Sequence, residues 1–453
     1  MNNRLLWVLL LIVSAGSVFA QEGRIKFQEY DLDNGLHVIL HQDNSTPIVV
    51  VSVLYHVGSK NEPEGRTGFA HFFEHLMFEG SDNIKRGEFD KYITNAGGVN
   101  NANTTFDRTY YYDLLPSNQL ELGLWLESER MLHAKIDSTG IATQKEVVKE
   151  EKRMRIDNRP YMSFQEKMFG AAFKGTNYEW TPIGSFADID AATEDDFKDF
   201  YHTFYVPNNA TLSIAGDIDI EQAKKWIDKY FAGIPKGTKE IPRPKITAPD
   251  LGDEVRETVF DNVQLPAVMY GYRIPKQGTD DYYALQLLTT LLSGGQSARF
   301  YKELVDKEQI ALQVFAFPFS LEDGGLFITI GLANLGKSPE DLESSMEREI
   351  EKVKTEPISD EEYQKLQNQI ENDFVSSNST DQGIAESLAD YHVYFGDANL
   401  VNTELERYKK VTKEDIMRVA QKYLTKDNRV VLYYLPKSAQ QKPDDSAVDS
   451  KNK

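Results

Sequence analysis

A repeat at a fixed distance along the chain constrains the fold more than any other feature. The run Thr46-Pro-Ile-Val-Val-Val-Ser-Val53 matches Leu265-Pro-Ala-Val-Met-Tyr-Gly-Tyr272, and the two runs differ in numbering by 219 (265 minus 46). The same offset carries Thr193-Glu-Asp-Asp-Phe197 onto Thr412-Lys-Glu-Asp-Ile416. Two distant matches in one register are rare by chance, so the chain is predicted to hold two copies of one domain.

Each copy has short β-rich runs followed by longer helical patterns. Residues 36–40 and 48–55 have the length and apolar character of strands, whereas residues 120–132 repeat with a helical period. We therefore predict an α+β fold of two homologous domains, each a mostly antiparallel sheet with helices packed on one face. The predicted segments are a signal peptide at 1–20, an N-terminal domain at 21–232, a Pro-rich linker at 233–252, a C-terminal domain at 253–436 and a disordered tail at 437–453.

The start of the chain has the layout of a signal peptide. Arg4 precedes a short apolar run, and Val18-Phe-Ala20 forms a small-x-small cleavage site before Gln21. The apolar run is too short to span a bilayer. We therefore expect an exported protein, in the periplasm or the medium, with no membrane span after cleavage. The chain has no cysteine, so its exported fold depends on core packing without disulfides.

The formal net charge of −21 limits the partners of the chain. An acidic balance of this size argues against nucleic acid or an anionic membrane as a partner. It would attract basic peptides, but acidity also simply keeps a protein soluble. The charge therefore excludes classes of partner without identifying a substrate.

The first copy contains a pattern that can bind a metal ion. His71 and His75 are at positions i and i+4, so in a helix both imidazoles project from one face. Glu74 precedes the second histidine and can reach a water on the metal, whose pKa zinc lowers to about 7. This H-x-x-E-H order is typical of a group of zinc peptidases. Alternatively, two histidines on an apolar helix stripe can be packing or capping residues.

Two histidines and a water leave a tetrahedral zinc ion one protein ligand short. If residues 144–155 are helical, Glu151 shares a face with Val147 and Val148, whereas Glu150 lies on another face. A carboxylate on a buried face needs a partner, which is either zinc or an arginine such as Arg155. Glu151 is the first candidate for the third ligand, and Glu150 is the alternative.

With these features the sequence resembles the pitrilysin/insulinase family of zinc peptidases, and within it the bacterial relatives of the mitochondrial processing peptidase β-subunit. In that family the third ligand follows the second histidine at a spacing that matches the step from His75 to Glu151 (151 minus 75 is 76). The likeness covers nearly the whole chain after the signal peptide. Its carriers are residues 65–75, Gly97-Gly98, Asn101-Ala102, residues 147–151, Asn158-Arg-Pro160, Pro182-Ile-Gly184 and residues 207–217.

The resemblance implies one Zn²⁺ per chain, held by His71, His75 and Glu151, with Glu74 as the general base. It also implies that Asn101 and Ala102 lie on an edge strand beside the zinc, where a substrate backbone would add as an extra strand. An ordinary turn is the alternative there, because Gly-Gly and Asn-rich stretches form turns. Between His202 and His392 there is no histidine, so the second copy cannot build the same site.

The sequence departs from the family in two places. Gln144 stands where relatives usually carry a glutamate, so a charged carboxylate near the ligands is missing. Val305 and Leu312 stand where active single-chain relatives carry an arginine and a tyrosine that grip the substrate carbonyl, and neither can donate a hydrogen bond to a developing oxyanion. Members lacking the pair are typically zinc-bearing subunits of a heterodimer. The alternative is a homodimer in which Arg299 or Tyr301 takes over.

Together these features predict a zinc-dependent metalloendopeptidase that hydrolyses peptides or unstructured polypeptide segments. The resemblance implies that the two halves face each other as a clamshell around an enclosed chamber. We expect a homologous subunit without zinc to supply the missing arginine and tyrosine. The alternative from another class is a non-catalytic assembly or peptide-binding subunit, although such relatives usually have a degraded H-x-x-E-H motif.

Overall fold

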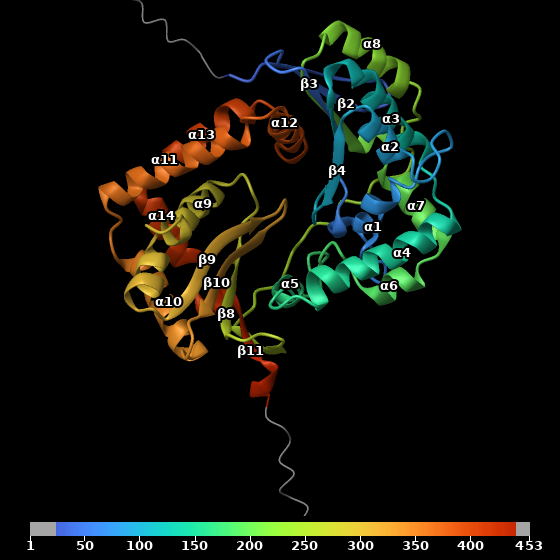
Figure 1. Ribbon diagram of the computed structural model, residues 1–453. Coiled ribbons are helices and arrows are strands. Elements are labelled where there is room, and N and C mark those ends of the chain that lie inside the picture. Colours follow the sequence, from blue (N-terminus) through green and yellow to red (C-terminus); the bar gives the residue numbers. More distant parts are fainter. Residues whose placement is uncertain (1–23, 441–453) are drawn as a thin grey trace, which may run out of the picture.

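The computed structural model describes residues 24–440 and divides them into two halves, each built around one β-sheet (Figure 1). The predicted signal peptide lies outside the described residues. Of the predicted tail, residues 437–439 form a turn of 3-10 helix that contacts the second sheet, and residues 441–453 lie outside the described part. Between residues 24 and 440, no helix is long and apolar enough to cross a membrane.

The first sheet has six strands in the order β1-β2-β6-β3-β5-β4. Its neighbouring strands run antiparallel except for the parallel pair β2 and β6. Strand β4 pairs with β5 alone within the described residues, so it is an edge strand. The strands are β1 (Phe27–Asp31), β2 (His37–Gln42), β3 (Ile48–Tyr55), β4 (Val99–Thr104), β5 (Thr109–Pro116) and β6 (Ala210–Gly216).

The second sheet has five strands in the order β7-β11-β8-β10-β9. Here too one pair is parallel, β7 with β11, and the remaining pairs are antiparallel. The order repeats that of the first sheet from β2 onward. The strands are β7 (Val255–Asp261), β8 (Ala267–Ile274), β9 (Ala311–Ser320), β10 (Gly325–Ala333) and β11 (Arg429–Pro436).

The helices divide between the two halves. Those of the first half are α1 (Phe69–Leu76), α2 (Phe89–Asn95), α3 (Leu120–His133), α4 (Ser138–Lys152), α5 (Phe164–Ala172), α6 (Phe186–Ala191), α7 (Glu194–Phe204) and α8 (Ile220–Phe231). Those of the second half are α9 (Asp280–Ser293), α10 (Pro339–Thr355), α11 (Asp360–Ser377), α12 (Asp381–Phe395), α13 (Leu400–Lys410) and α14 (Lys413–Tyr423). The mixed α+β class and the two-sheet architecture predicted from the sequence are confirmed.

The repeat found in the sequence is also a repeat of structure. Adding 219 to the bounds of β3 gives the bounds of β8, and adding it to those of α7 gives those of α14. Both helices begin with a capping box, in which Thr193 and Thr412 each exchange hydrogen bonds with the aspartate at the third helical position. A capping box satisfies two backbone N–H groups that a helix start would otherwise leave unpaired. The same local signal therefore starts the same helix in both copies.

One helix of each half packs on the sheet of the other half (Figure 1). The apolar side of α12 lies against β2, β3 and β6 of the first sheet, and α5 lies against β8 and β11 of the second. Positions 164–172 of α5 become 383–391 when 219 is added, which falls inside α12, so the exchange is reciprocal. Gly271 on β8 makes room for α5, because a Cβ there would lie 2.4 Å from the sulfur of Met168. Each sheet therefore has helices of its own half on one face and a helix of the other half on the opposite face.

The stretch between α8 and β7, residues 232–254, contains no helix or strand. It is nevertheless attached to the first half. Asn61 donates a hydrogen bond to the carbonyl of Pro242, and Arg243 donates to the carbonyl of His56. The Pro-rich segment thus crosses from one half to the other along a defined path.

Candidate metal centre

Helix α1 carries both histidines of the H-x-x-E-H motif, and its start is held by a buried carboxylate. The Oε2 of Glu62 accepts the N–H of Gly68 at 2.9 Å, and its Oε1 accepts the N–H of Ala70 at 2.8 Å. Backbone N–H groups at a helix start have no partner within the helix, so a carboxylate there stabilises them. Gly68 has a φ of 93°, in the left-handed region that favours glycine. This turn sets the direction in which α1 leaves the preceding loop.

Three donor atoms converge between α1 and α4. The Nε2 atoms of His71 and His75 are 3.4 Å apart. The Oε2 atom of Glu151 on α4 lies 2.9 Å from Nε2 of His75 and 3.6 Å from Nε2 of His71. Burial raises the pKa of the Glu151 carboxyl, but the hydrogen bonds from the two histidines outweigh this and hold it well below its usual range. The structure therefore brings together the three residues that the sequence indicated as ligands.

The alternative ligand, Glu150, points away from this cluster. Its side chain is 58% exposed and pairs with Arg153 at 3.1 Å. The predicted alternative partner of Glu151 is also present, because Arg155 Nη1 lies 2.8 Å from Glu151 Oε1. That arginine is largely exposed, and exposed ion pairs contribute little. One oxygen of Glu151 thus faces the histidines while the other faces Arg155.

The face of α4 that packs toward α1 differs in part from the one predicted. Val148 is fully buried, whereas Val147 is 42% exposed, so the two valines do not share the buried face.

Gln144, on the same helix as Glu151, donates through Nε2 to Glu79 Oε1 at 2.6 Å. Glu79 also pairs with Arg86. The amide of Gln144 therefore contacts the carboxylate of Glu79, in the loop after α1.

The donor set fits a zinc ion. Zinc binds imidazole nitrogen and carboxylate oxygen, and a catalytic site combines three protein ligands with one open position. Two imidazole nitrogens and one carboxylate oxygen, separated by 2.9 to 3.6 Å, are present here. His71 and Glu151 border a cavity of about 450 Å³ that is also lined by Glu74, Asn101 and Ala102. The cavity leaves room for a fourth, exchangeable ligand.

Glu74 faces the same cavity without belonging to the three-donor cluster. Its Oε2 atom accepts a hydrogen bond of 2.6 Å from the hydroxyl of Thr104 at the end of β4. Thr104 was not predicted from the sequence. The two-residue period of strands could have indicated it, because Thr104 follows Ala102 on the same face of β4. The motif is therefore joined to the edge strand by a direct side-chain contact.

The edge strand β4 supplies both residues expected beside the metal. Asn101 is exposed, and its Oδ1 accepts the N–H of Ala102 at 2.9 Å. This backbone donor is therefore satisfied by the side chain before it. A peptide that adds to β4 would have to displace the Asn101 side chain to reach that N–H.

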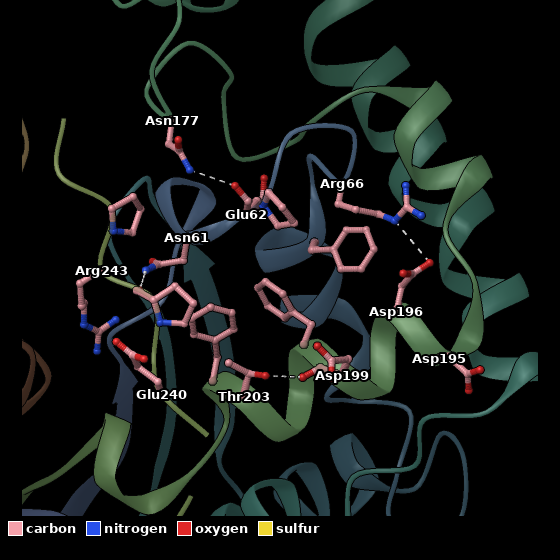
Figure 2. Close-up of a pocket in the computed structure, with 16 residues that line it drawn as sticks. Asn61, Glu62, Arg66, Asn177, Asp195, Asp196, Asp199, Thr203, Glu240 and Arg243 are labelled. Atoms are coloured by element: carbon pink, nitrogen blue, oxygen red, sulfur yellow. Dashed lines mark hydrogen bonds and ion pairs between the residues drawn. The ribbon is translucent and has the colours of Figure 1, made fainter. Parts of the chain in front are cut away.

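A larger cavity lies elsewhere in the first half (Figure 2). It has a volume of about 990 Å³ and lies between α7, the loop before α1 and the Pro-rich segment. Figure 2 shows Arg66 pairing with Asp196 across one wall and Asn61 contacting the Pro-rich segment on another. None of its lining residues is a histidine. A site chosen by cavity volume alone would thus be this cavity, and it would miss the H-x-x-E-H motif.

The second half lacks the corresponding ligands. Its described residues contain a single histidine, His392 on α12, so it cannot repeat the histidine pair of α1. Val305 is partly buried and Leu312 is 49% exposed. Neither side chain has a polar group to offer.

Arg299 and Tyr301, which were considered as substitutes for the arginine and tyrosine expected from the family resemblance, also lie in the second half. Arg299 makes a two-pronged ion pair with Glu362, with Nε–Oε1 and Nη2–Oε2 distances of 2.9 and 3.1 Å. The guanidinium lowers the pKa of Glu362 to about 2. Tyr301 begins a short π-helix, residues 301–307. Arg299 is therefore committed to a contact within its own half.

Sequence models of two families match the chain. The model described as insulinase (peptidase family M16) matches residues 37–183, and that described as peptidase M16 inactive domain matches residues 191–370. The zinc protease PqqE of Helicobacter pylori is 33% identical over 432 residues, which cover 94% of this chain and 97% of that protein. The uncharacterized zinc protease YmxG of Bacillus subtilis is 21% identical, covering 89% of this chain and 97% of that protein.

Solved structures show the same architecture. The crystal structure of a protease from Helicobacter pylori superposes with a TM-score of 0.87 at 32% identity, covering 91% of this chain and all of that one. The periplasmic protease PqqL from Escherichia coli gives a TM-score of 0.75 at 18% identity. That match covers 90% of this chain but 47% of PqqL, so the chain spans about half of the larger protein.

Proposed function

We propose that this chain, which belongs to the insulinase family of peptidases (M16), is a zinc-dependent endopeptidase acting on peptides or unstructured polypeptide segments. The observation that carries the proposal is the convergence of three donor atoms from His71, His75 and Glu151 beside Glu74 and a free strand edge. Residues that only pack or cap would not need two imidazoles and a carboxylate aimed at one point.

In this proposal each residue around the cavity has one task. His71, His75 and Glu151 would hold one zinc ion, which supplies Lewis acidity for a water molecule and for the peptide carbonyl. Glu74 accepts the proton of the attacking water at its carboxylate and later passes it to the leaving amine. Thr104 orients that carboxylate through its hydrogen bond to Oε2. Glu74 needs no place among the ligands for this role, because it acts on the water and the amine.

Strand β4 would bind the substrate by strand addition. Its outer edge is unpaired within the described residues, and Asn101 and Ala102 line the cavity that also holds Glu74. Main-chain hydrogen bonds along an edge favour extended segments with little dependence on side chains. Folded proteins do not offer such a segment, which restricts the substrates to peptides and unstructured stretches.

A second, homologous chain would complete the site. Val305 and Leu312 cannot donate to a developing oxyanion, and Arg299 is held by Glu362. A partner without zinc that carries the arginine and tyrosine would supply those donors, so we favour a heterodimer over a homodimer. We also propose export through a signal peptide at residues 1–20, a location that the periplasmic neighbour PqqL favours.

The deciding experiment follows cleavage of a long unstructured peptide by mass spectrometry. The purified, zinc-loaded chain is compared with Glu74→Gln, which keeps the shape of the side chain but cannot take the proton. We expect Glu74→Gln to retain zinc and to lose activity by a factor of about 10² to 10⁴. The same change is also made in the Val305→Arg, Leu312→Tyr background described below, and measurable cleavage that Glu74→Gln leaves unchanged in either background would refute Glu74 as the base.

A gain-of-function variant tests the partner. Val305→Arg combined with Leu312→Tyr places both hydrogen-bond donors, an arginine and a tyrosine, within one chain. Leu312 is already half exposed, so a larger side chain fits there. We expect the wild-type chain alone to be weakly active or inactive, and the double variant to be faster. Full activity of the wild-type chain alone would remove the need for a partner. Zinc binding without cleavage, in both forms and with candidate partners, would favour a non-catalytic peptide-binding subunit.

A further inference from the structure

Helix α12 lies along β2, the strand of the first sheet that carries two further histidines. His37, Ile39 and His41 alternate along β2, so their side chains project from the same face. Ile39 packs against the apolar side of α12. His392, in the last turn of α12, meets His37 at one end of this contact. The two imidazoles belong to different halves of the molecule, so their contact joins the halves.

His37 and His392 lie face to face with a carboxylate beside them. The ring centroids are 3.4 Å apart and the ring planes differ by 4°. Glu29 on β1 places its Oε2 atom 3.4 Å from Nε2 of His37. One potential ligand atom from each of the three residues lies within 4.8 Å of the others. Two imidazoles and one carboxylate form the same donor set as the candidate catalytic centre.

The proton of His37 is placed so that Nε2 is free to bind a metal. Asp31 accepts a hydrogen bond of 2.7 Å from Nδ1 of His37, which fixes the proton on that nitrogen. The Nε2 atom is buried and has no hydrogen-bond partner among the described residues. A carboxylate that orients a histidine through its other ring nitrogen is the usual arrangement around protein-bound zinc.

We propose that Glu29, His37 and His392 form a second zinc site, which joins the two halves of the chain. The ligands come from β1 and β2 of the first half and from α12 of the second, so an ion bound there fixes α12 against the first sheet. Imidazole lone pairs lie in the ring plane, so the two rings would have to tilt out of their parallel stack to bind one ion. Three protein ligands would leave one position for water.

The other end of α12 provides an internal comparison. His41, Asp43 and Asp381 also have ligand atoms within 4.8 Å of one another, and Nδ1 of His41 contacts the carbonyl of Lys26. Asp381 is the first residue of α12. Variants of this second group can show which end of the helix takes up zinc.

The test is the number of zinc ions per chain, measured by elemental analysis of the full protein after equilibration with Zn²⁺ and removal of free metal. We expect two in the wild type and one in His392→Gln. Glu29→Gln should also hold one, and this variant is safe for folding because Glu29 is 45% exposed. His202→Gln replaces an exposed histidine outside both sites and should keep two.

The two sites can be told apart by their variants. Glu151→Gln should remove the first zinc and leave the second, whereas His392→Gln should do the reverse. In the Glu151→Gln background added Zn²⁺ should still raise the thermal unfolding temperature, and this rise should disappear when His392→Gln is added. An unchanged zinc content in both His392→Gln and Glu29→Gln would overturn the proposal. Loss of the second zinc in His41→Gln instead would place it at the other end of α12, which also overturns it.

Discussion

Replacing Glu322 with glutamine should weaken the attachment between the two halves by about 2 kcal/mol at pH 7. Glu322 lies in the turn between β9 and β10, and its Oε2 atom contacts His56 Nε2 at 3.0 Å and Lys60 Nζ. Lys60 is almost fully enclosed and also contacts Asp107 and Asp323 at 3.0 and 3.1 Å. Residues of the first half thus hold a hairpin of the second half through ion pairs centred on the buried ammonium group of Lys60.

The magnitude follows from the protonation of Glu322. Burial raises its pKa, but contacts with His56 and Lys60 lower it overall from 4.5 to about 2. At 1.36 kcal/mol per pKa unit this corresponds to about 3 kcal/mol. The side chain is 26% exposed, and a glutamine oxygen still accepts hydrogen bonds, so we expect about 2 kcal/mol. The folded pKa is depressed, so this stabilisation is present above pH 4.5 and is lost as the pH falls toward 2.

Scanning calorimetry of the wild type and Glu322→Gln at several pH values tests this. For a cooperative unit the size of one half, about 2 kcal/mol lowers the unfolding temperature by about 4 to 8 °C at pH 7. The difference should shrink as the pH approaches 2. Glu361→Gln, at an exposed position on α11, should unfold like the wild type. Equal unfolding temperatures at pH 7, or a difference that persists at low pH, would refute the reasoning.

Three further predictions concern the candidate metal centre. Glu151→Gln should lower zinc affinity, as measured by competition with a chelator, whereas Glu150→Gln should bind zinc like the wild type because that side chain is exposed. Ala102→Pro removes a backbone donor from the free edge of β4 and should lower kcat/KM for peptides while zinc content stays constant. Thr104→Val should lower kcat by about fivefold, the value of one hydrogen bond of about 1 kcal/mol to Glu74, without changing zinc content.

The fold was largely predictable because its strongest signals are local and occur twice. Alternating and apolar runs indicated β2 and β3, and a helical period indicated α3. The repeat at an offset of 219 then predicted a second copy with the same order of elements, as observed. The exchange of α5 and α12 between the halves was not predictable, because nothing in an amphipathic helix says which of two similar sheets it will cover.

The candidate site was likewise predictable from the sequence only in part. The spacing of His71 and His75 is a property of one helix, so their convergence could be derived from the sequence. The choice between Glu151 and Glu150 depends on how α4 is rotated against α1, and the spacing known from the family pointed to Glu151 before the structure did. The predicted valine face was wrong at Val147, which shows how little the pattern alone fixed that rotation.

The sequence by itself determined what short-range chemistry can encode: a duplicated α+β chain, a helix with two histidines on one face, and apolar side chains at 305 and 312. Tertiary structure alone decided which distant residues share a site. The contacts of Glu74 with Thr104 and of His37 with His392 depend on strand order and on a helix that crosses to the other half. Such contacts arise from global packing, in which many weak apolar interactions act together, and no local pattern records their outcome.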